Sequence, residues 1–193
     1  VIFMEDTTGF LPGREQETGG IVQAGRAMLD AIVDLRTPRF LVILRNAFGG
    51  AYASYNNYPT GADFVIALPT TRAAVMGPAG VEFVYKDELR AIRGQRQERL
   101  AGELKNLRES GMAEEEAIVV AKRHVDAWVK ESEAALATRY ERELMNPNEA
   151  LSLGSISQIV MPSELRKVIA ENLLFHLGHY TPEPFAGVQR EFH

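Results

Sequence analysis

A short, uninterrupted apolar run constrains the fold of this chain more than any other feature. The segment Phe40-Leu41-Val42-Ile43-Leu44 has the length of a strand and contains no polar residue, which is typical of a parallel strand covered on both faces. Another apolar run opens the chain at Val1–Met4, and apolar residues between Ile21 and Leu35 recur at helical spacing. Two strands joined by such a helix form a β-α-β unit, so the pattern predicts an α/β fold.

A glycine turn follows this buried run. Phe48-Gly49-Gly50-Ala51 leads from the expected strand into a short helix. Glycine allows close approach and unusual dihedral angles, and the first amides of a helix have no partner within it. Two successive N–H groups could therefore meet one negative oxygen, as in an oxyanion hole. Taken alone, the turn is weak evidence for such a site, because glycines in this position more often form a tight turn with no chemical role.

The rest of the chain divides by composition. Phe64–Leu68 and Arg72–Met76 have the pattern of two further short strands, whereas the charged segment from Glu82 to Met145 predicts a helical hairpin interrupted at Gly111. Beyond it, Ile156–Val160 is strand-like, and an amphipathic helix and an extended tail are expected. We therefore predict an α/β core with glycine-rich loops over residues 1–85, a helical arm over 86–145, and a closing α/β segment with its tail over 146–193.

Composition excludes several classes of function. The net charge of -5 and the interleaving of 21 basic with 26 acidic residues argue against nucleic-acid binding, which needs clustered basic side chains. No apolar run is long enough to predict a membrane span. The absence of cysteine excludes disulfides and thiolate metal sites and is consistent with a cytoplasmic protein. His176 and His179 lie three residues apart, but no third ligand is evident nearby, so no metal site is expected.

Several motifs, read in order, resemble the carboxyltransferase (beta) subunits of biotin-dependent acyl-CoA carboxylases. Gly9-Phe10-Leu11-Pro12-Gly13 is similar to their PGFLPG loop, and Arg45 to Tyr52 reads RNAFGGAY, close to their R-x-AFGGAY. Similar matches follow at Gly61-Ala62-Asp63 and at Ala74-Val75-Met76-Gly77. The resemblance is dense over residues 1–85 and looser over 146–177, whereas residues 86–145 exceed the usual connector of the family.

The resemblance implies a crotonase-like ββα superhelix with a long helical insertion, forming the second of two domains in a complete subunit. The opening Val1-Ile2-Phe3-Met4, with no initiator Met, fits a chain cut from a longer polypeptide. In the family, the amides matching Gly50 and Ala51 donate to the ureido oxygen of biotin, which makes these two residues the expected catalytic and cofactor-binding positions. A small residue at Ala53 would suit an acyl group bulkier than acetyl. The expected substrate-binding residues are Gly9, Phe10, Gly13, Phe48, Gly49, Tyr52 and Ala53.

The same resemblance implies the cofactor, the substrate and the partners. Biotin would arrive on a separate carrier protein or domain, acyl-CoA would be the substrate, and no metal would be needed in this domain. The expected partners are an N-terminal carboxyltransferase half, a biotin carboxyl carrier and a biotin carboxylase component, within a homo- or hetero-oligomer. The chain alone is not expected to catalyse transfer without that N-terminal half.

Three other functions stay open from the sequence. The alpha subunit of a biotin-dependent acyl-CoA decarboxylase, of the glutaconyl-CoA type, shares the fold and runs the transfer in the opposite direction. A biotin-independent hydratase or isomerase of the crotonase superfamily would need a carboxylate near the thioester, for which Glu5 and Asp6 are the nearest candidates. A non-catalytic assembly subunit would use the helical arm to dock a partner.

Overall fold

The computed structural model describes residues 1–182, and these fall into two compact units. The first, here called the α/β unit, contains Val1–Val75 together with the chain from Asn146 onward. The second, here called the helical unit, is Met76–Met145. The division of the chain at residues 85 and 145 stays a prediction. The expected extended tail, Tyr180–His193, falls almost wholly outside the described residues.

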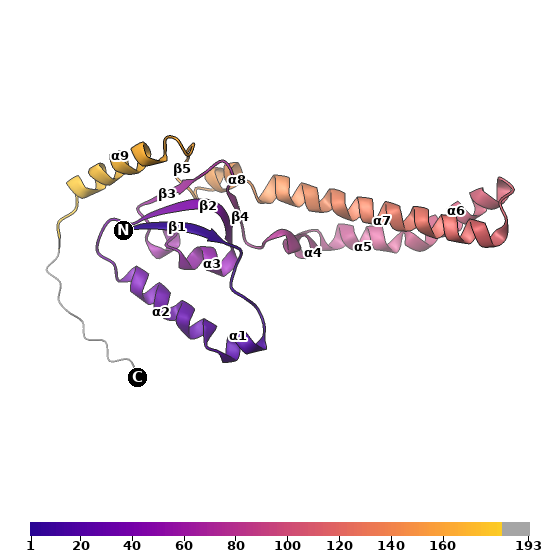
Figure 1. Cartoon of the computed structure of the whole chain (residues 1–193), viewed down its shortest axis with the longest axis horizontal. Helices are drawn as coiled ribbons and strands as arrows, with labels where there is room; N and C mark the ends of the chain where they lie inside the picture. Colours follow the sequence, from indigo (N-terminus) through magenta and orange to yellow (C-terminus); the bar gives the residue numbers. More distant parts are fainter. Residues whose placement is uncertain (183–193) are drawn as a thin grey trace. The chain divides into compact units, whose positions relative to one another are not determined.

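A parallel sheet forms the centre of the α/β unit (Figure 1). Strand β1 (Ile2–Thr7) pairs with β2 (Phe40–Phe48), β2 with β3 (Phe64–Ala67), and β3 with the short β5 (Gln158–Ile159). Strand β4 (Arg72–Ala74) pairs with β2 beyond the part of β2 that pairs with β3. All four pairings are parallel, so the predicted α/β class is confirmed.

Strand β2 is buried because side chains cover both of its faces. Phe40, Leu41, Val42 and Ile43 are all 0% exposed. Leu41 and Ile43 belong to a core that includes Val65 and Ala67 and is covered by Tyr52 and Tyr55. Val42 and Ile66 face the other way, toward Leu165, Val168 and Ile169. The apolar run Phe40–Leu44 is thus the doubly covered strand that the sequence predicts.

Helices cover the two faces of this sheet. Helix α2 (Ile21–Val33) connects β1 to β2 and contacts α3 (Gly49–Ser54), while α9 (Leu165–Gly178) covers the opposite face (Figure 1). The β-α-β unit expected at the start of the chain is therefore present. The short helices α1 (Arg14–Thr18) and α8 (Pro147–Ser152) and the 3-10 turn η1 (Tyr58–Thr60) complete this unit.

Several element ends differ from the sequence-based expectation. Strand β1 continues to Thr7 rather than ending at Met4, because Asp6 hydrogen-bonds to the neighbouring strand at Asn46. The last strand keeps only two of the five predicted residues, since its pairing with β3 is limited to Gln158 and Ile159. Helix α2 ends at Val33, two residues earlier than expected.

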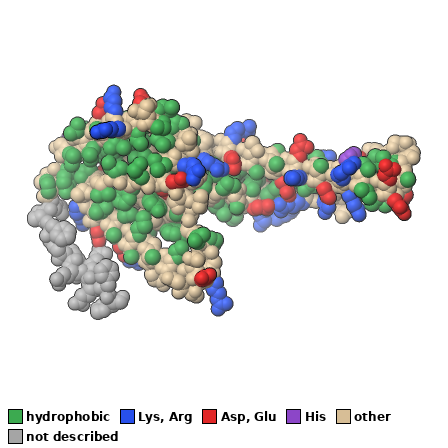
Figure 2. Space-filling model, viewed as in Figure 1, with side chains coloured by type: hydrophobic (Ala, Val, Ile, Leu, Met, Phe, Trp, Pro, Cys, Tyr) green, Lys and Arg blue, Asp and Glu red, His purple; other side chains and the backbone are tan. Residues whose placement is uncertain are grey.

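The helical unit is a helical hairpin, as predicted. After η2 (Pro78–Gly80), three helices follow in turn, α4 (Val81–Val84), α5 (Lys86–Gly94) and α6 (Arg96–Glu109). The chain reverses around Gly111, whose φ is 86°, and the 31-residue α7 (Glu114–Leu144) packs along α6 and α5. The buried seam uses small residues of α7, Ala117 and Ala121, as well as the larger Val125 and Tyr140. On the surface of the helical unit, acidic and basic side chains are interspersed (Figure 2).

Candidate active site

The glycine turn lies where β2 ends and α3 begins. Gly49 has φ +59°, and a Cβ atom there would lie 2.9 Å from the carbonyl oxygen of Val75. Both observations require glycine at this position. The chain then enters α3 with Gly50 exposed and Ala51 buried.

The amides of Gly50 and Ala51 lie at the start of α3. Neither N–H group donates a hydrogen bond to another group within the described residues. They belong to the first turn of α3, where no preceding helical carbonyl is available. Two adjacent N–H groups can accordingly serve an acceptor that comes from outside the chain.

The loop after β1 lies beside this turn. A Cβ atom on Gly50 would be 3.8 Å from the ring of Phe10, and one on Gly25 of α2 would be 3.5 Å from the same ring. Gly9 and Gly13, at the two ends of the loop, have φ values of 126° and 122°. Phe10 and Gly50, 40 residues apart in the sequence, therefore meet at one place, as expected of parts of one site.

The remaining predicted substrate-binding residues differ in their exposure. Phe48 is almost completely buried, whereas Ala53 is partly exposed. Tyr52 packs on the core of the sheet, and its hydroxyl donates to the carbonyl oxygen of Ser155 at 3.2 Å. Burial, followed by the charges of Glu5 and Tyr58, raises the pKa of Tyr52 to about 12. Tyr52 is thus a neutral, inward-facing side chain that anchors α3.

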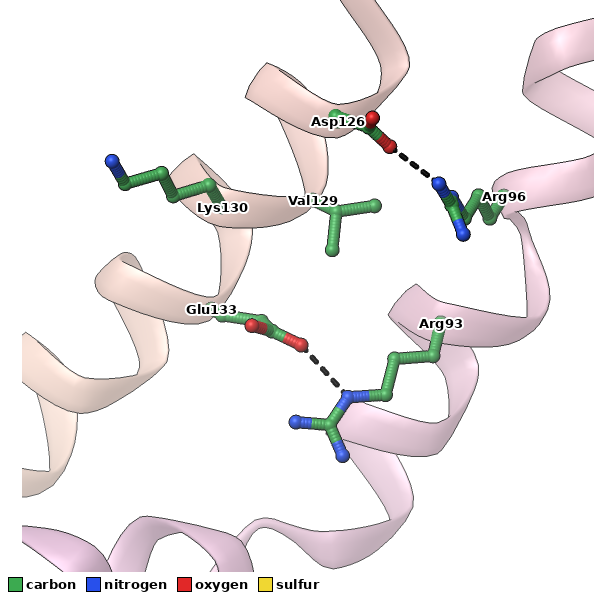
Figure 3. A pocket seen from close by; sticks show the side chains of 6 residues that line it. All are labelled: Arg93, Arg96, Asp126, Val129, Lys130 and Glu133. Carbon is green, nitrogen blue, oxygen red and sulfur yellow. Dashed lines mark hydrogen bonds and ion pairs between the residues drawn. The ribbon is translucent and has the colours of Figure 1, made fainter. Parts of the chain in front are cut away.

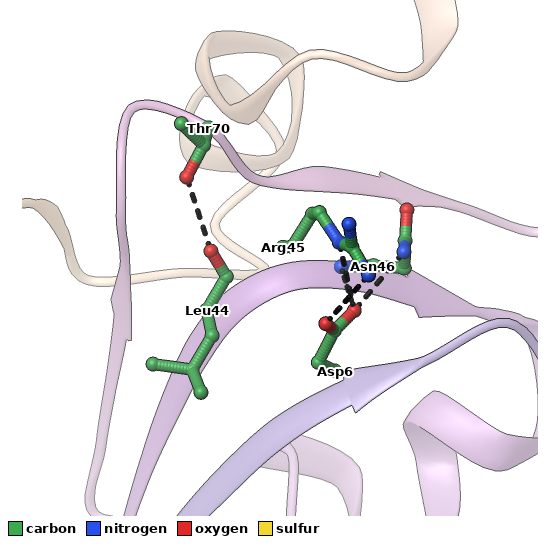
Figure 4. Close-up of polar contacts among 5 residues, drawn as sticks. All are labelled: Asp6, Leu44, Arg45, Asn46 and Thr70. Carbon is green, nitrogen blue, oxygen red and sulfur yellow. Dashed lines mark hydrogen bonds and ion pairs between the residues drawn. The ribbon is translucent and has the colours of Figure 1, made fainter.

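An acidic side chain that the sequence-based site did not include ties β1 to β2. The carboxylate of Asp6 accepts hydrogen bonds from the backbone N–H and the Nδ2 of Asn46, both at 3.0 Å, and pairs with Arg45 at 3.0 Å (Figure 4). The Asn46 backbone N–H and the Arg45 side chain, the two largest influences, lower the pKa of Asp6. In the same view, the Thr70 hydroxyl donates to the carbonyl oxygen of Leu44. This network fixes the strand end from which the glycine turn begins.

Glu5, next to Asp6, has the opposite environment. Its side chain is 0% exposed, and neither carboxyl oxygen has a hydrogen-bond partner within the described chain. Burial, and secondarily the charge of Asp6, raises the pKa of Glu5 to about 8. The sequence carries no signal for this burial, because the apolar run that predicts the strand ends at Met4, one residue before Glu5.

A hollow in the helical unit is lined by paired charges rather than by free catalytic groups. Arg93 bonds Glu133 at 2.7 Å, and Arg96 bonds Asp126 at 2.7 Å, across the space between α7 and the helices before it (Figure 3). Val129 and Lys130 complete its lining. Because four of the five charged groups here are already paired, we interpret this hollow as part of the helix-helix contact.

The histidines have structural neighbours. The ring of His176 packs edge-on against Phe40 with centroids 5.4 Å apart, and Nδ1 of His179 lies 2.8 Å from the carbonyl oxygen of Phe175. Within residues 1–182, no three His, Asp or Glu side chains gather as a metal site would require. Over the same residues, no helix has the length and apolar character needed to cross a membrane.

Comparison with known proteins matches this arrangement to one family. The family description "Carboxyl transferase domain" matches residues 1–183. A biotin-dependent acetyl-/propionyl-coenzyme A carboxylase beta5 subunit of Mycobacterium leprae is 34% identical over 90% of this chain and 26% of its own length. The methylmalonyl-CoA decarboxylase subunit alpha of Veillonella parvula is 44% identical over 46% of this chain and 18% of its own length.

Solved structures show the same relationship. The transcarboxylase 12S structure, a hexamer with hydrolysed methylmalonyl-coenzyme A bound, superimposes with a TM-score of 0.67 and 27% identity, over 99% of this chain and 30% of that one. The crotonase-like fold expected from the sequence is thereby confirmed. The chain spans less than a third of the length of these relatives. It belongs to the carboxyl transferase domain family, whose relatives include the beta subunits of acyl-CoA carboxylases.

Proposed function

We propose that this chain supplies the biotin-side half of an active site that transfers a carboxyl group between carboxybiotin and an acyl-CoA. The observation that carries the proposal is a pair of amides, Gly50 and Ala51, at the start of α3 beside Phe10, which have no hydrogen-bond partner within residues 1–182. Family membership supports it, because similar proteins are named as acetyl-/propionyl-CoA carboxylase and methylmalonyl-CoA carboxyltransferase subunits.

The residues fit a ureido oxygen. Carbonyl-type oxygens accept two hydrogen bonds, and the two donors here are adjacent in one turn. The dipole of the first helical turn favours negative charge at that place. Carboxybiotin, when bound, would supply CO2 to the acyl-CoA carbon that loses its proton, and the ureido nitrogen freed by that release would take up the proton. The N–H groups of Gly50 and Ala51 would then bind the oxygen on which negative charge develops during transfer.

The neighbouring residues would shape the site rather than transfer protons. Gly49 allows the backbone to turn into α3, and the Phe10 ring lies beside Gly50 and Gly25, next to the donors. Ala53 would line the acyl side and leave room for more than an acetyl group. Because the ureido ring handles the proton, no side-chain base of this chain is required.

The partners proposed here rest on the family to which the chain belongs. We expect the acyl-CoA to bind largely to an N-terminal carboxyltransferase half, and biotin to arrive on a carrier carboxylated by a biotin carboxylase. The subunits would form a homo- or hetero-oligomer that operates in the cytoplasm. The acyl-CoA decarboxylase direction is a second candidate, favoured by the similarity to the Veillonella parvula protein over the part of the chain that matches it.

A hydratase or isomerase role is less consistent with the geometry. Such an enzyme needs an accessible carboxylate close to its substrate. Glu5 is completely buried, and Asp6 is held by Arg45 and Asn46. Neither of the acidic residues suggested for that chemistry is free to act on a thioester.

The assay that tests the proposal joins this chain to an N-terminal carboxyltransferase half. The complex is mixed with a carboxylated biotin carrier and acetyl-, propionyl- or longer acyl-CoA, and the carboxylated acyl-CoA is measured. We expect product that is lost when avidin sequesters the biotin; the reverse reaction, from malonyl- or methylmalonyl-CoA, distinguishes the decarboxylase direction. Avidin-resistant hydration of an enoyl-CoA, with no carboxyl transfer in either direction, would contradict the proposal.

A further inference from the structure

Glu5 is a buried acid for which the proposed chemistry has no use. It lies on β1 opposite Ile43 of β2, one residue before Asp6. Neighbouring residues of a strand point to opposite faces, so Asp6 reaches the partly exposed pair with Arg45 while Glu5 points into the unit. Burying a carboxyl group without hydrogen bonds lowers the stability of the fold. We therefore looked for a functional role of Glu5 that would offset this cost.

The helix that carries the two donor amides covers this carboxyl group. Helix α3 contacts β1, and Phe3, two residues before Glu5 and on the same face of β1, packs on the same core as Tyr52 of α3. The Tyr52 hydroxyl donates to Ser155 and not to Glu5. Glu5 therefore lies beneath α3, on the side of the helix that faces the sheet.

The surroundings of Glu5 favour its neutral form. The titratable or charged groups on the elements packed there are Asp6 on β1 itself, Arg45 on β2 and Tyr52 on α3. Arg45 is engaged with Asp6, and Tyr52 is neutral over the physiological range. Burial, followed by the Asp6 charge, places the pKa near 8, so the carboxyl group is protonated at neutral pH.

We propose that protonated Glu5 is a positioning residue, which keeps α3 seated on the sheet so that the N–H groups of Gly50 and Ala51 stay aimed at their acceptor. Loss of this proton leaves an unpaired carboxylate beneath the helix. That charge demands water or a displaced α3, and it opposes the negative oxygen that the amides are to stabilise. The inference rests on the proposed function, since it assigns Glu5 to that same site.

The first experiment compares pH profiles of carboxyl transfer in the assembled enzyme. The wild-type kcat should fall roughly tenfold between pH 7 and pH 9, the fall expected when one essential proton with a pKa near 8 is lost. Glu5→Gln keeps the shape but cannot ionise, so its kcat should change less than about twofold over that range, with an unchanged KM for acyl-CoA. Glu164→Gln, an exposed change in the same unit, should follow the wild-type profile.

The second experiment needs no catalysis. The folded chain holds the Glu5 proton more tightly than the unfolded chain, so the stability of the wild type falls as pH rises from about 4.5 to about 8. The thermal midpoint of Glu5→Gln should therefore rise relative to that of the wild type as pH increases across this window. The thermal midpoint of Glu164→Gln should keep a constant difference from the wild type. This result is independent of whether the proposed transfer reaction is correct.

The outcomes separate the two claims. A gap in thermal midpoint that stays constant from pH 5 to pH 8 would overturn the buried proton itself. The difference in thermal midpoint between the two proteins could widen with pH while kcat falls equally in both at alkaline pH. That combination would overturn the positioning role. Absence of transfer activity in the wild type would count against the proposed function, while the thermal comparison would still decide the ionisation of Glu5.

Discussion

The α/β unit and the helical unit of this chain are built by different means. In the α/β unit, four successive residues of β2 are inaccessible to solvent and pack against large side chains on both faces of the sheet. In the helical unit, four residues of the 31-residue α7 are buried, two of them alanines, and more than half of its positions are exposed. Precise backbone placement, which an oxyanion-type site requires, is therefore found in the first unit.

Charge separates the units as clearly as packing does. Arg93 of the helical unit bonds both Glu82 and Glu133 at the surface, and Arg96 bonds Asp126. The α/β unit instead contains Glu5, whose buried carboxyl oxygens have no hydrogen-bond partner in the part of the chain that the structure describes. Features that lower stability, such as a buried carboxyl group without hydrogen bonds, are most often found at functional sites. Glu5 is such a feature, and it lies beneath α3, the helix that begins at the glycine turn.

The largest effect on stability is expected in the centre of the sheet. Leu41→Ala removes a 0% exposed side chain from the core around Val65 and should lower the free energy of unfolding by about 2–5 kcal/mol. Denaturant unfolding followed by circular dichroism measures this loss. Leu153→Ala, at a 72% exposed position of the same unit, is the matched control and should stay within about 0.5 kcal/mol. Equal losses in the two variants would contradict the described core.

A smaller effect is expected in the seam of the helical unit. Val125→Ala removes two buried carbons from α7 and should cost about 1–2 kcal/mol. Trp128, the single tryptophan of the chain, lies on the same helix, so its fluorescence follows this unit selectively. The exposed Val119→Ala is the control. Leu41→Ala should shift the unfolding transition seen by Trp128 fluorescence less than Val125→Ala does. The opposite order would contradict the view that the two units are stabilised separately.

The smallest effect is expected from the surface charges. Arg93→Gln removes two exposed ion pairs, which salt screens and which contribute little to stability. The thermal midpoint should drop by an amount close to the measurement error at physiological ionic strength, and by slightly more at low salt. Arg123→Gln, at an exposed arginine of the same helical unit, provides the reference. A large loss that persists at high salt would show that Arg93 has a role beyond surface pairing.

Much of the fold followed from the sequence because the strongest local signals agree with the tertiary structure. The apolar run from Phe40 predicts the buried strand, and Gly111 predicts the reversal of the hairpin. Strand ends were less predictable, since they depend on partners distant in sequence. Strand β1 includes Asp6, whose carboxylate accepts hydrogen bonds from Asn46, 40 positions later in the chain.

The candidate site was predictable only in part. The motifs predict Gly9, Phe10 and Gly50 as site residues, and the structure places the Phe10 ring beside Gly50, while their roles stay a prediction. Glu5 was considered only as a possible base, because the pattern of a strand does not show which residues a later helix will cover. Ala117 and Ala121 were likewise missed as seam residues, since alanine carries little hydrophobic signal although it allows close helix packing.

The backbone of Gly50 provides the most direct test of the central claim. Gly50→Pro removes one N–H at the start of α3, where proline is tolerated, while Gly50→Ala keeps that N–H and places its Cβ in ordinary contact with Phe10, at 3.8 Å. Carboxyl transfer in the assembled enzyme should fall about a hundredfold or more in the proline variant, and far less in the alanine variant. If both variants retained similar transfer rates while remaining folded, the amide of Gly50 would have no part in the reaction.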